Sequence, residues 1–359
     1  MSAVTPSLLA ETQGLLRCPA CAGTLEMSGD SCGMHCRACQ RPFPCEEGIP
    51  LLFWPTELEA EQDVTDVVKA FYEETPFPNY DDLDSRWHLR EKARQGIFAR
   101  LLDEQISPNA NILEVGCGTG QLANFLGMTW GRTVFGADLC LNSLKLANRF
   151  KEENQISRVA FLQMNLFQPV FRPDSFDVVI CNGVLHHTGA PFRGFQTIAK
   201  LVKPGGVIVV GLYHRWGRLR TDLRRAIFRV CSDRFQFLDP RLRDKTLNER
   251  RRLAWFMDQY KNPHESKHTF GEILDWFDRC NMQFLNSIPK AEAFTPFAPN
   301  EQLFHVHPPG TKFDHLIVQL GMFLAGDREG GFFIMIGRKP TVFSGQASSG
   351  ATLGEPPAV

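Results

Sequence analysis

Three glycines spaced two residues apart, Gly116, Gly118 and Gly120, follow directly on the apolar stretch Ile112–Val115. This pattern predicts a buried strand that ends in a tight loop, and glycine lets a ligand lie against the backbone of such a loop. The spacing fits neither the dinucleotide fingerprint G-x-G-x-x-G nor the phosphate loop G-x-x-x-x-G-K-[ST]. Glu114 stands two residues before the first glycine and no lysine follows, so the loop favours a cationic ligand over an anionic one.

Four cysteines form a second pattern, in which Cys18-x2-Cys21 is followed by Cys36-x2-Cys39. The C-x2-C-x14-C-x2-C spacing is typical of a structural zinc site with four thiolate ligands. Disulfide bonds are the alternative, which the lack of a secretory leader before these residues disfavours. Because so short a segment buries little core of its own, we expect metal binding to drive its folding.

Further strands are predicted after the glycine loop, at Thr133–Asp138, Val159–Leu166, Ser175–Asn182 and Val207–Gly211. Segments rich in Leu and Ala between them are predicted helices, and this alternation favours a parallel sheet covered on both faces. Asp138 ends the second strand, where a carboxylate can accept hydrogen bonds from the two hydroxyls of a ribose. A cationic ligand that also carries a ribose is S-adenosylmethionine, which has a sulfonium and an ammonium group.

The segment from Asn111 to Tyr213 resembles the class I S-adenosylmethionine-dependent methyltransferases, in particular the families called methyltransferase type 11 and type 12. The resemblance rests on the E-V-G-C-G-T-G loop, on Asp138, on the run S-F-D-V-V-I-C-N-G-V-L-H-H and on K-P-G-G. It implies an α/β fold with a doubly wound, mostly parallel, seven-stranded Rossmann-like sheet. Met282–Ile288 and Phe332–Gly337 would then supply the antiparallel hairpin that closes the sheet.

The resemblance also implies a set of cofactor-binding residues, namely Tyr72, Glu114, Gly116, Gly118, Gly120, Asp138, Asn165, Leu166 and Asn182. The three glycines would lie along the methionine part, and Glu114 would order their loop. Asp138 would hold the ribose, although it could instead cap a helix. Asn165 and Leu166 would flank the adenine, where many relatives carry Asp in place of the Asn. Asn182 would lie at the mouth of the site, and Tyr72 either near the methionine or in packing.

Four residues are candidates for catalysis: His186, His187, Tyr260 and His264. The two adjacent histidines follow a predicted strand end, where they could act as a base or only shape the pocket. Tyr260 and His264 lie in a dense polar loop, together with Glu265 and His268, that we expect above the methyl-transfer site. Residues of this loop could contact substrate, act as a base, or cap the helix that follows.

Residues 15–54 resemble the zinc ribbon of Trm112-like proteins and the ribbon of the 23S ribosomal RNA guanine-N1 methyltransferases. The resemblance leaves the role of this ribbon open, since it could bind RNA, bind a protein or brace the catalytic domain. Cys32 and Cys45 lie in the same segment but fit the ligand spacing less well. We expect them not to bind metal, although Cys32 could replace a ligand in a shifted register.

The predicted organisation has four parts. They are a zinc ribbon at 1–55, a linker with N-terminal helices at 56–107, a methyltransferase domain at 108–343 and a disordered tail at 344–359. Within the domain, 213–270 is predicted to be a helical lid insertion and 290–330 a second insertion. Two helices, Val64–Tyr72 and Leu89–Gln105, are expected before the domain.

The lid insertion is unusually rich in arginine. A helical pattern runs from Arg215 to about Tyr260, with Leu219, Leu223, Ile227 and Val230 on one face. Its arginines could meet the phosphates of a nucleic acid, a nucleotide-linked substrate or a lipid. The alternative is a solvated helix face with local ion pairs.

Composition limits the broad class of the protein. The formal net charge is −1 over 359 residues, so the chain as a whole has no charge that would attract nucleic acid. No apolar run reaches the roughly 20 residues of a membrane span. Many cysteines without a leader sequence favour a reducing compartment, and we therefore expect a cytoplasmic protein.

The first functional hypothesis is a methyltransferase that transfers a methyl group from S-adenosylmethionine to a small or carrier-linked metabolite, with structural Zn2+ in the ribbon. The second is an RNA methyltransferase, acting on rRNA or tRNA, that uses the ribbon and the arginines for substrate binding. The third is a non-catalytic scaffold that only binds S-adenosylmethionine. The chain reads N-G-V-L after the predicted fourth strand, so the N-P-P-Y motif for amino-group methylation of bases is absent there. The sequence predicts neither the acceptor atom nor the oligomeric state.

Overall fold

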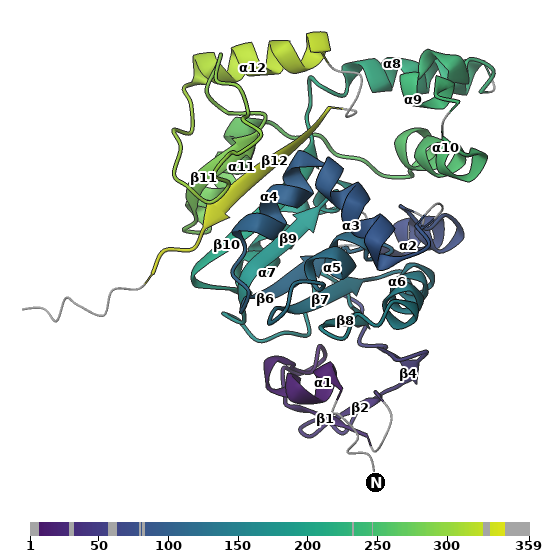
Figure 1. The fold of residues 1–359 in the computed structure, drawn as a ribbon, viewed down its shortest axis with the longest axis vertical. Coiled ribbons are helices and arrows are strands. Elements are labelled where there is room, and N and C mark those ends of the chain that lie inside the picture. Colours follow the sequence, from purple (N-terminus) through teal and green to yellow (C-terminus); the bar gives the residue numbers. More distant parts are fainter. Residues whose placement is uncertain are drawn as a thin grey trace, which may run out of the picture.

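A computed structural model describes residues 7–28, 32–56, 63–78, 80, 83–231, 233–245, 247–325 and 331–341 of the chain. Its centre is a seven-stranded sheet in the order β11-β12-β10-β9-β6-β7-β8 (Figure 1). The strands are β6 (Asn111–Val115), β7 (Thr133–Asp138), β8 (Val159–Gln163), β9 (Phe176–Asn182), β10 (Val202–Tyr213), β11 (Gln283–Ile288) and β12 (Phe332–Arg338). The predicted doubly wound, mostly parallel sheet is confirmed, whereas the predicted tail at 344–359 lies outside the described residues.

Strand directions follow the predicted pattern. β6, β7, β8, β9 and β10 are parallel neighbours, and β12 runs antiparallel to both β10 and β11. The predicted closing hairpin is therefore confirmed. β10 begins earlier than predicted, at Val202, because the K-P-G-G turn is accommodated by an irregularity between Val202 and Val207, with Gly205 at φ +82°.

Helices cover both faces of the sheet, as alternating strands and helices require. One face carries α3 (Arg86–Gln95), α4 (Ile97–Gln105), α5 (Gln121–Leu126) and α6 (Leu141–Glu153), and the other carries α7 (Pro191–Ala199) and α11 (Phe270–Arg279) (Figure 1). The prediction of a single helix over Leu89–Gln105 is wrong. It is two helices, because Gly96 between α3 and α4 has extended backbone with ψ 116°.

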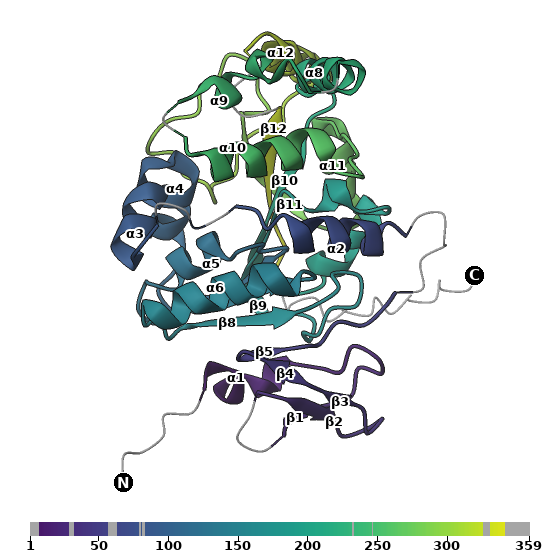
Figure 2. The ribbon, with the colours of Figure 1, turned by 90° about the vertical axis from the view of Figure 1, so that its right-hand side faces the viewer.

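The N-terminal segment forms a small separate set of strands. β1 (Leu25–Met27), β2 (Met34–Cys36) and β3 (Pro42–Phe43) make a three-stranded sheet, and β4 (Cys45–Glu46) pairs with β5 (Ile49–Pro50). The short helix α1 (Leu8–Glu11) and the turn η1 (Gln13–Leu15) precede them. We call residues 7–54 the ribbon, which lies at the end of the molecule beside β8 (Figure 2).

The ribbon is joined to the sheet through backbone hydrogen bonds at the edge strand β8. Leu51 pairs in parallel with Gln163, and the Leu52 N–H donates to the Gln163 carbonyl at 3.1 Å. A second contact follows β8, where the Arg17 N–H donates to the Val170 carbonyl at 2.7 Å. An uncovered edge strand could pair with another chain, so the ribbon also protects the sheet.

The lid insertion is helical, but it is divided. It contains α8 (Leu219–Val230), the turn η3 (Gln236–Leu238), α9 (Pro240–Arg243), α10 (Glu249–Phe256) and one π-helical turn, η4 (Met257–Lys261). Asp239 and Asn248 end the continuous pattern by capping new helices, since their side chains accept hydrogen bonds from the N–H groups of Arg241 and Arg251 at 2.7 and 2.8 Å.

Two more helices complete the described chain. α2 (Thr65–Glu74) precedes the domain and matches the predicted helix at 64–72. α12 (Lys312–Ala325) lies in the second insertion and neighbours α8 at the end of the molecule opposite the ribbon (Figures 1 and 2). None of the helices in the described ranges is long and apolar enough to cross a membrane.

Candidate functional site

The glycine loop after β6 requires glycine at each of its three predicted positions. Gly116, Gly118 and Gly120 all have positive φ, at +68°, +52° and +69°. A Cβ atom on Gly116 would lie 2.3 Å from Val184, and one on Gly118 would lie 2.5 Å from the Phe77 carbonyl oxygen. The loop thus passes close to two other segments while it borders a cavity.

That cavity has a volume of about 620 Å³, within the usual range for small-molecule sites. It lies at the carboxyl ends of the parallel strands, beneath α2 and the lid. Eight of the nine predicted cofactor residues line it, namely Tyr72, Glu114, Gly116, Gly118, Asp138, Asn165, Leu166 and Asn182. Gly120 is not in the lining, because it starts α5 and faces Phe161 and Ala147.

Asp138 joins the end of β7 to the glycine loop. Its Oδ2 accepts from the Gly118 N–H at 2.7 Å, and its Oδ1 accepts from the Cys140 N–H at 2.8 Å. Burial raises the pKa of this carboxyl, while the backbone N–H groups of Cys140 and Gly118 act in the opposite direction. Each oxygen retains lone-pair capacity for a further donor, such as a ribose hydroxyl.

Glu114 offers an unsatisfied acceptor beside the same loop. Its Oε2 is buried and has no hydrogen-bond partner among the described residues. Burial raises the pKa of this carboxyl to about 8, with a smaller contribution from the negative charge of Asp138. A buried acceptor without a partner costs free energy, and a ligand ammonium group would supply both the donor and the opposite charge. The residues present therefore fit a cationic cofactor.

We expect Asp138→Ala to lower the affinity for S-adenosylmethionine at least tenfold, measured by isothermal titration calorimetry. The substitution removes the proposed ribose acceptor and both backbone hydrogen bonds that hold the loop, and about 1.4 kcal/mol is enough for that factor. Asp275→Ala, an exposed change on α11, serves as the matched control. Unchanged affinity in the Asp138 variant would remove this residue from the ribose site.

His187 is the predicted catalytic residue that reaches the cavity. It lies in the short turn η2 (Leu185–His187) after β9, and it is one of the residues that line the cavity. Its Nδ1 lies 2.8 Å from the His264 carbonyl oxygen, which can only accept, so Nδ1 carries the proton. Burial lowers the pKa of this imidazole below 6.5, although the nearby carboxylate of Asp258 opposes that shift. Near neutral pH, His187 therefore keeps an unprotonated Nε2.

The other three predicted catalytic residues lie outside the cavity lining. His186 is completely buried and lies against the Tyr213 ring, at 4.1 Å between ring centroids. Tyr260 donates its hydroxyl proton to Asp239 at 2.6 Å and packs against Phe228. His264 contacts the site only through its carbonyl group, because its own ring bonds the Thr188 carbonyl at 3.1 Å. Their positions do not support contact with a ligand in this cavity.

A polar network above the glycine loop was missed by the sequence analysis. The carboxylate of Asp258 accepts from the Tyr72 hydroxyl at 2.9 Å and from the Gln259 amide at 2.8 Å. The same amide donates to the Tyr213 hydroxyl at 2.7 Å. All four residues line the cavity, and burial is the main cause that raises the pKa values of both tyrosines. The network gives the cavity a polar wall in addition to Glu114 and Asp138.

A buried ion pair supports this wall from behind. The guanidinium of Arg218 donates to Glu265 through Nε at 3.1 Å and lies 3.8 Å from the centre of the Tyr213 ring. Arg225 also donates to Glu265, at 2.8 Å. Burial alone would raise the pKa of Glu265, but Arg218 and Arg225 outweigh it and hold the pKa at about 2. Glu265 therefore positions the lid rather than contacting a ligand.

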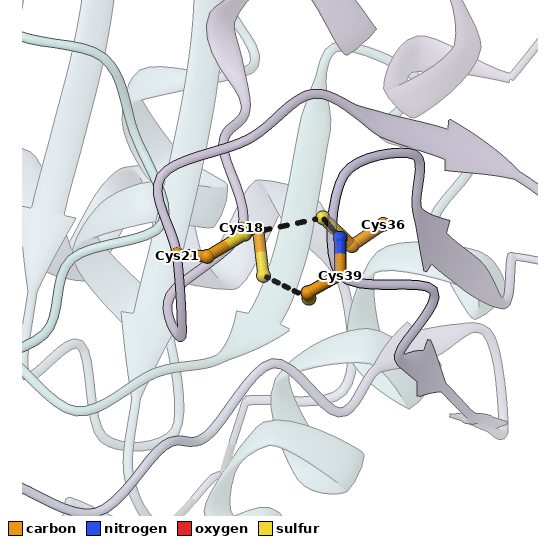
Figure 3. A group of neighbouring side chains, drawn as sticks. All are labelled: Cys18, Cys21, Cys36 and Cys39. Carbon is orange, nitrogen blue, oxygen red and sulfur yellow. Dashed lines mark hydrogen bonds between the residues drawn. The ribbon is translucent and has the colours of Figure 1, made fainter.

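The four ribbon cysteines gather into one cluster (Figure 3). Their sulfur atoms all lie within 4.8 Å of one another, with Cys18 and Cys39 at 3.8 Å and Cys21 and Cys36 at 3.4 Å. A tetrahedral zinc with bonds of about 2.3 Å would separate its sulfur ligands by about 3.8 Å. The residues present therefore fit a four-thiolate metal site.

Local backbone geometry explains how the two C-x2-C turns form. The residue after each turn, Ala22 or Gln40, has positive φ, at 60° and 58°. The Cys39 N–H also points at the Cys36 sulfur, at 3.5 Å. The two cysteines excluded from the predicted site, Cys32 and Cys45, are joined by a disulfide bond. Neither is part of the cluster, as expected, but their pairing was not predicted.

A family profile described as a methyltransferase domain matches residues 113–210. The match begins in β6 and ends in β10, so it includes the glycine loop, Asp138 and His187. The chain contains a methyltransferase domain. The ribbon, α2 and the whole lid lie outside the match, so the profile does not describe the polar wall around Asp258.

Two protein relatives illustrate how far this likeness extends. An uncharacterized protein of Synechococcus is 27% identical over 252 residues, which cover 62% of this chain and 60% of that protein. A ubiquinone biosynthesis O-methyltransferase of Paracidovorax citrulli is 35% identical over 105 residues, which cover 29% of this chain and 44% of that protein. The chain thus spans less than two thirds of the length of either relative.

Solved structures resemble the chain at low sequence identity. A complex between the Haloferax volcanii Trm112 methyltransferase activator and a methyltransferase aligns with a TM-score of 0.44 at 15% identity, covering 78% of this chain and 99% of that chain. PKMT2 from Rickettsia typhi in complex with AdoHcy aligns with a TM-score of 0.47 at 16% identity, covering 64% of this chain and 48% of that chain.

Proposed function

We propose that the protein is an S-adenosylmethionine-dependent methyltransferase whose acceptor is a small or carrier-linked metabolite with a hydroxyl or similarly weak acid group. One observation carries this proposal. A single cavity is lined both by the glycine loop with Glu114 and Asp138 and by His187 and Asp258. The donor and the acceptor of a transfer reaction could therefore bind in the same cavity.

The donor half is built from residues that the methyltransferase domain supplies. When bound, S-adenosylmethionine supplies an electrophilic methyl group on its sulfonium. Glu114 would pair with the ammonium group, Asp138 would hold the ribose, and Asn165 with Leu166 would flank the adenine. The Asn165 amide also donates to the Trp54 carbonyl at 3.0 Å, so the chain leading out of the ribbon borders the adenine position.

The acceptor half needs a proton acceptor and an orienting wall. Nε2 of neutral His187 would take the acceptor's proton as the acceptor atom bonds to the methyl carbon and the bond from that carbon to the sulfonium sulfur breaks, which leaves the electron pair on sulfur. The His264 carbonyl would stabilise the resulting imidazolium through Nδ1–H. Tyr72 and Gln259 would hold Asp258 so that it orients the acceptor. Orientation in an enclosed site can itself lower the barrier by several kcal/mol.

Three arginines of the lid are engaged within the protein, which favours a small acceptor over RNA. Arg218 and Arg225 form ion pairs with Glu265. Arg241 lies 4.1 Å from the centre of the Trp255 ring, and both residues line the cavity. These arginines build and close the site, so they are not arranged as a row of phosphate contacts. Binding to RNA that falls steeply with salt would instead favour the RNA alternative.

We further propose that the ribbon cluster holds one structural zinc ion through Cys18, Cys21, Cys36 and Cys39. The sulfur separations and the two matched turns support this assignment. Because the ribbon pairs with β8 and reaches Asn165 through Trp54, its role would be to brace the cofactor site.

The function can be tested by incubating the purified protein with methyl-labelled S-adenosylmethionine and a fractionated cell extract. We expect label in a small-molecule fraction, detected by mass spectrometry as a gain of one methyl group. Label confined to RNA would support the alternative acceptor instead. Binding of the cofactor with no labelled product in any fraction would support the non-catalytic scaffold.

A further inference from the structure

Helix α8 carries an apolar stripe that faces solvent. Leu219, Leu223 and Val230 repeat at helical spacing on one face, and each is between 41% and 84% exposed. Ala226 lies on the same stripe and is also exposed. The sequence predicted a face of Leu219, Leu223, Ile227 and Val230, which would normally be expected to pack against the protein core. In the structure, Ile227 packs against the buried cluster around Phe228, whereas the other three side chains are exposed.

Helix α12 carries a second stripe of the same kind. Phe313, Leu316, Leu320 and Leu324 lie on one helical face and are between 57% and 68% exposed. From residue 316 to residue 325 this helix contains no charged side chain. Single exposed leucines are common on soluble proteins, but two stripes of exposed apolar side chains on neighbouring helices are not.

The two helices meet at the same end of the molecule. Arg220 of α8 donates to the Leu324 carbonyl of α12 at 3.0 Å, and its guanidinium lies 5.7 Å from the centre of the Phe323 ring. Both views place α8 and α12 together at the end opposite the ribbon (Figures 1 and 2). We call the seven residues Leu219, Leu223, Val230, Phe313, Leu316, Leu320 and Leu324 the α8–α12 surface.

The segment that contains α8 has a strong positive charge. Residues 215–252 include thirteen Lys and Arg side chains against five Asp and Glu, a net charge of +8 in a chain whose total is −1. Two of these arginines, Arg218 and Arg225, are paired with Glu265 outside this segment, whereas others, such as Arg229 and Arg234, are exposed. The charge is thus concentrated in the part of the molecule that also exposes the apolar stripe.

We propose that the α8–α12 surface docks the protein onto an anionic lipid membrane. Helices that lie in a membrane interface combine apolar side chains on one face with Lys and Arg beside them. Basic side chains near an anionic bilayer are attracted to its surface charge, and the apolar stripes add the free energy of burial. A second copy of the chain would be a poorer partner, because a symmetric contact would bring two positively charged segments together. This proposal does not depend on the methyl acceptor.

Vesicle sedimentation with the full chain tests the proposal. We expect at least about tenfold more protein bound to vesicles of phosphatidylcholine with phosphatidylglycerol than to phosphatidylcholine alone, and a steep loss of binding at high salt. The double variant Leu316→Ser/Leu320→Ser should lose at least about tenfold of this binding. Both residues are exposed, so the thermal midpoint of unfolding should stay unchanged.

Trp130→Ser is the matched control, since Trp130 is 87% exposed in the loop between α5 and β7, outside the α8–α12 surface. It should bind vesicles like the unmodified protein. Equal binding to neutral and anionic vesicles, or no binding to either, would overturn the proposal. So would full vesicle binding by the double variant. A dimer in sedimentation velocity that the double variant abolishes would show that a second copy covers this surface instead.

Discussion

Replacing His187 by alanine is expected to lower kcat by about 10²–10⁴-fold, the usual contribution of a positioned general base. His187 lines the cavity, and its Nδ1–H is held by the His264 carbonyl, so Nε2 is left as the proton acceptor. Cofactor affinity should change little, because His187 is not among the residues proposed to hold the cofactor. Steady-state kinetics with the identified acceptor, together with calorimetry for the cofactor, would measure both quantities.

His187→Asn separates a catalytic role from a structural one. The asparagine amide could still donate to the His264 carbonyl, but it could not take a proton. If His187 is the base, the asparagine variant should be as slow as the alanine variant, and added imidazole should partly restore the alanine variant. Near-normal activity in His187→Asn would show that the residue only shapes the pocket.

The pH dependence gives the same assignment an independent check. Burial lowers the pKa of His187 from 6.5, so the base form persists at pH values where an exposed histidine would already be protonated. The kcat/KM of the unmodified enzyme should therefore stay level through neutral pH and fall only below about pH 6.5, as protonation of Nε2 removes the base. This low-pH fall should be absent from the residual activity of His187→Ala.

The donor half of the site was predictable because its residues are close in sequence. The positions of Gly116, Gly118 and Asp138 are fixed by strand ends and a short loop. Local constraints of this kind produce a residue spacing that can be recognised in the sequence. The acceptor half was not predictable in the same way. Tyr72 and Asp258 are hydrogen-bonded across a separation of 186 residues, and no local pattern encodes that contact.

The lid shows a second reason why sequence prediction failed. A regular helix was expected to run to about Tyr260, but its last turn is the π-helical η4. A π-turn changes which side chains share a face. Asp258 and Gln259 therefore reach the cavity, and Tyr260 packs against Phe228 in the lid. The only hint in the sequence was an adjacent acid and amide in an otherwise aromatic and apolar stretch.

Removing the metal is expected to destabilise more than the ribbon. We expect about one zinc per chain by elemental analysis, and its loss in Cys18→Ser/Cys39→Ser. Metal binding supplies roughly 10–16 kcal/mol of apparent folding free energy in zinc-finger peptides, which is comparable to the stability of a whole domain. The ribbon residues Leu16 and Leu52 belong to the same buried cluster as Phe171 of the domain. The variant should therefore unfold at a lower temperature as a whole.

Loss of the metal should also weaken binding of the cofactor. Without a folded ribbon, the Trp54 carbonyl would no longer hold the Asn165 amide, and β8 would lose its backbone pairing with Leu51 and Leu52. Cofactor affinity should fall together with zinc content during titration with a chelator. Cys280→Ser, which alters a cysteine outside the ribbon, should change neither quantity. Zinc loss with unchanged cofactor affinity would show that the ribbon does not brace the site, and a different role for it would then have to be sought in partner binding.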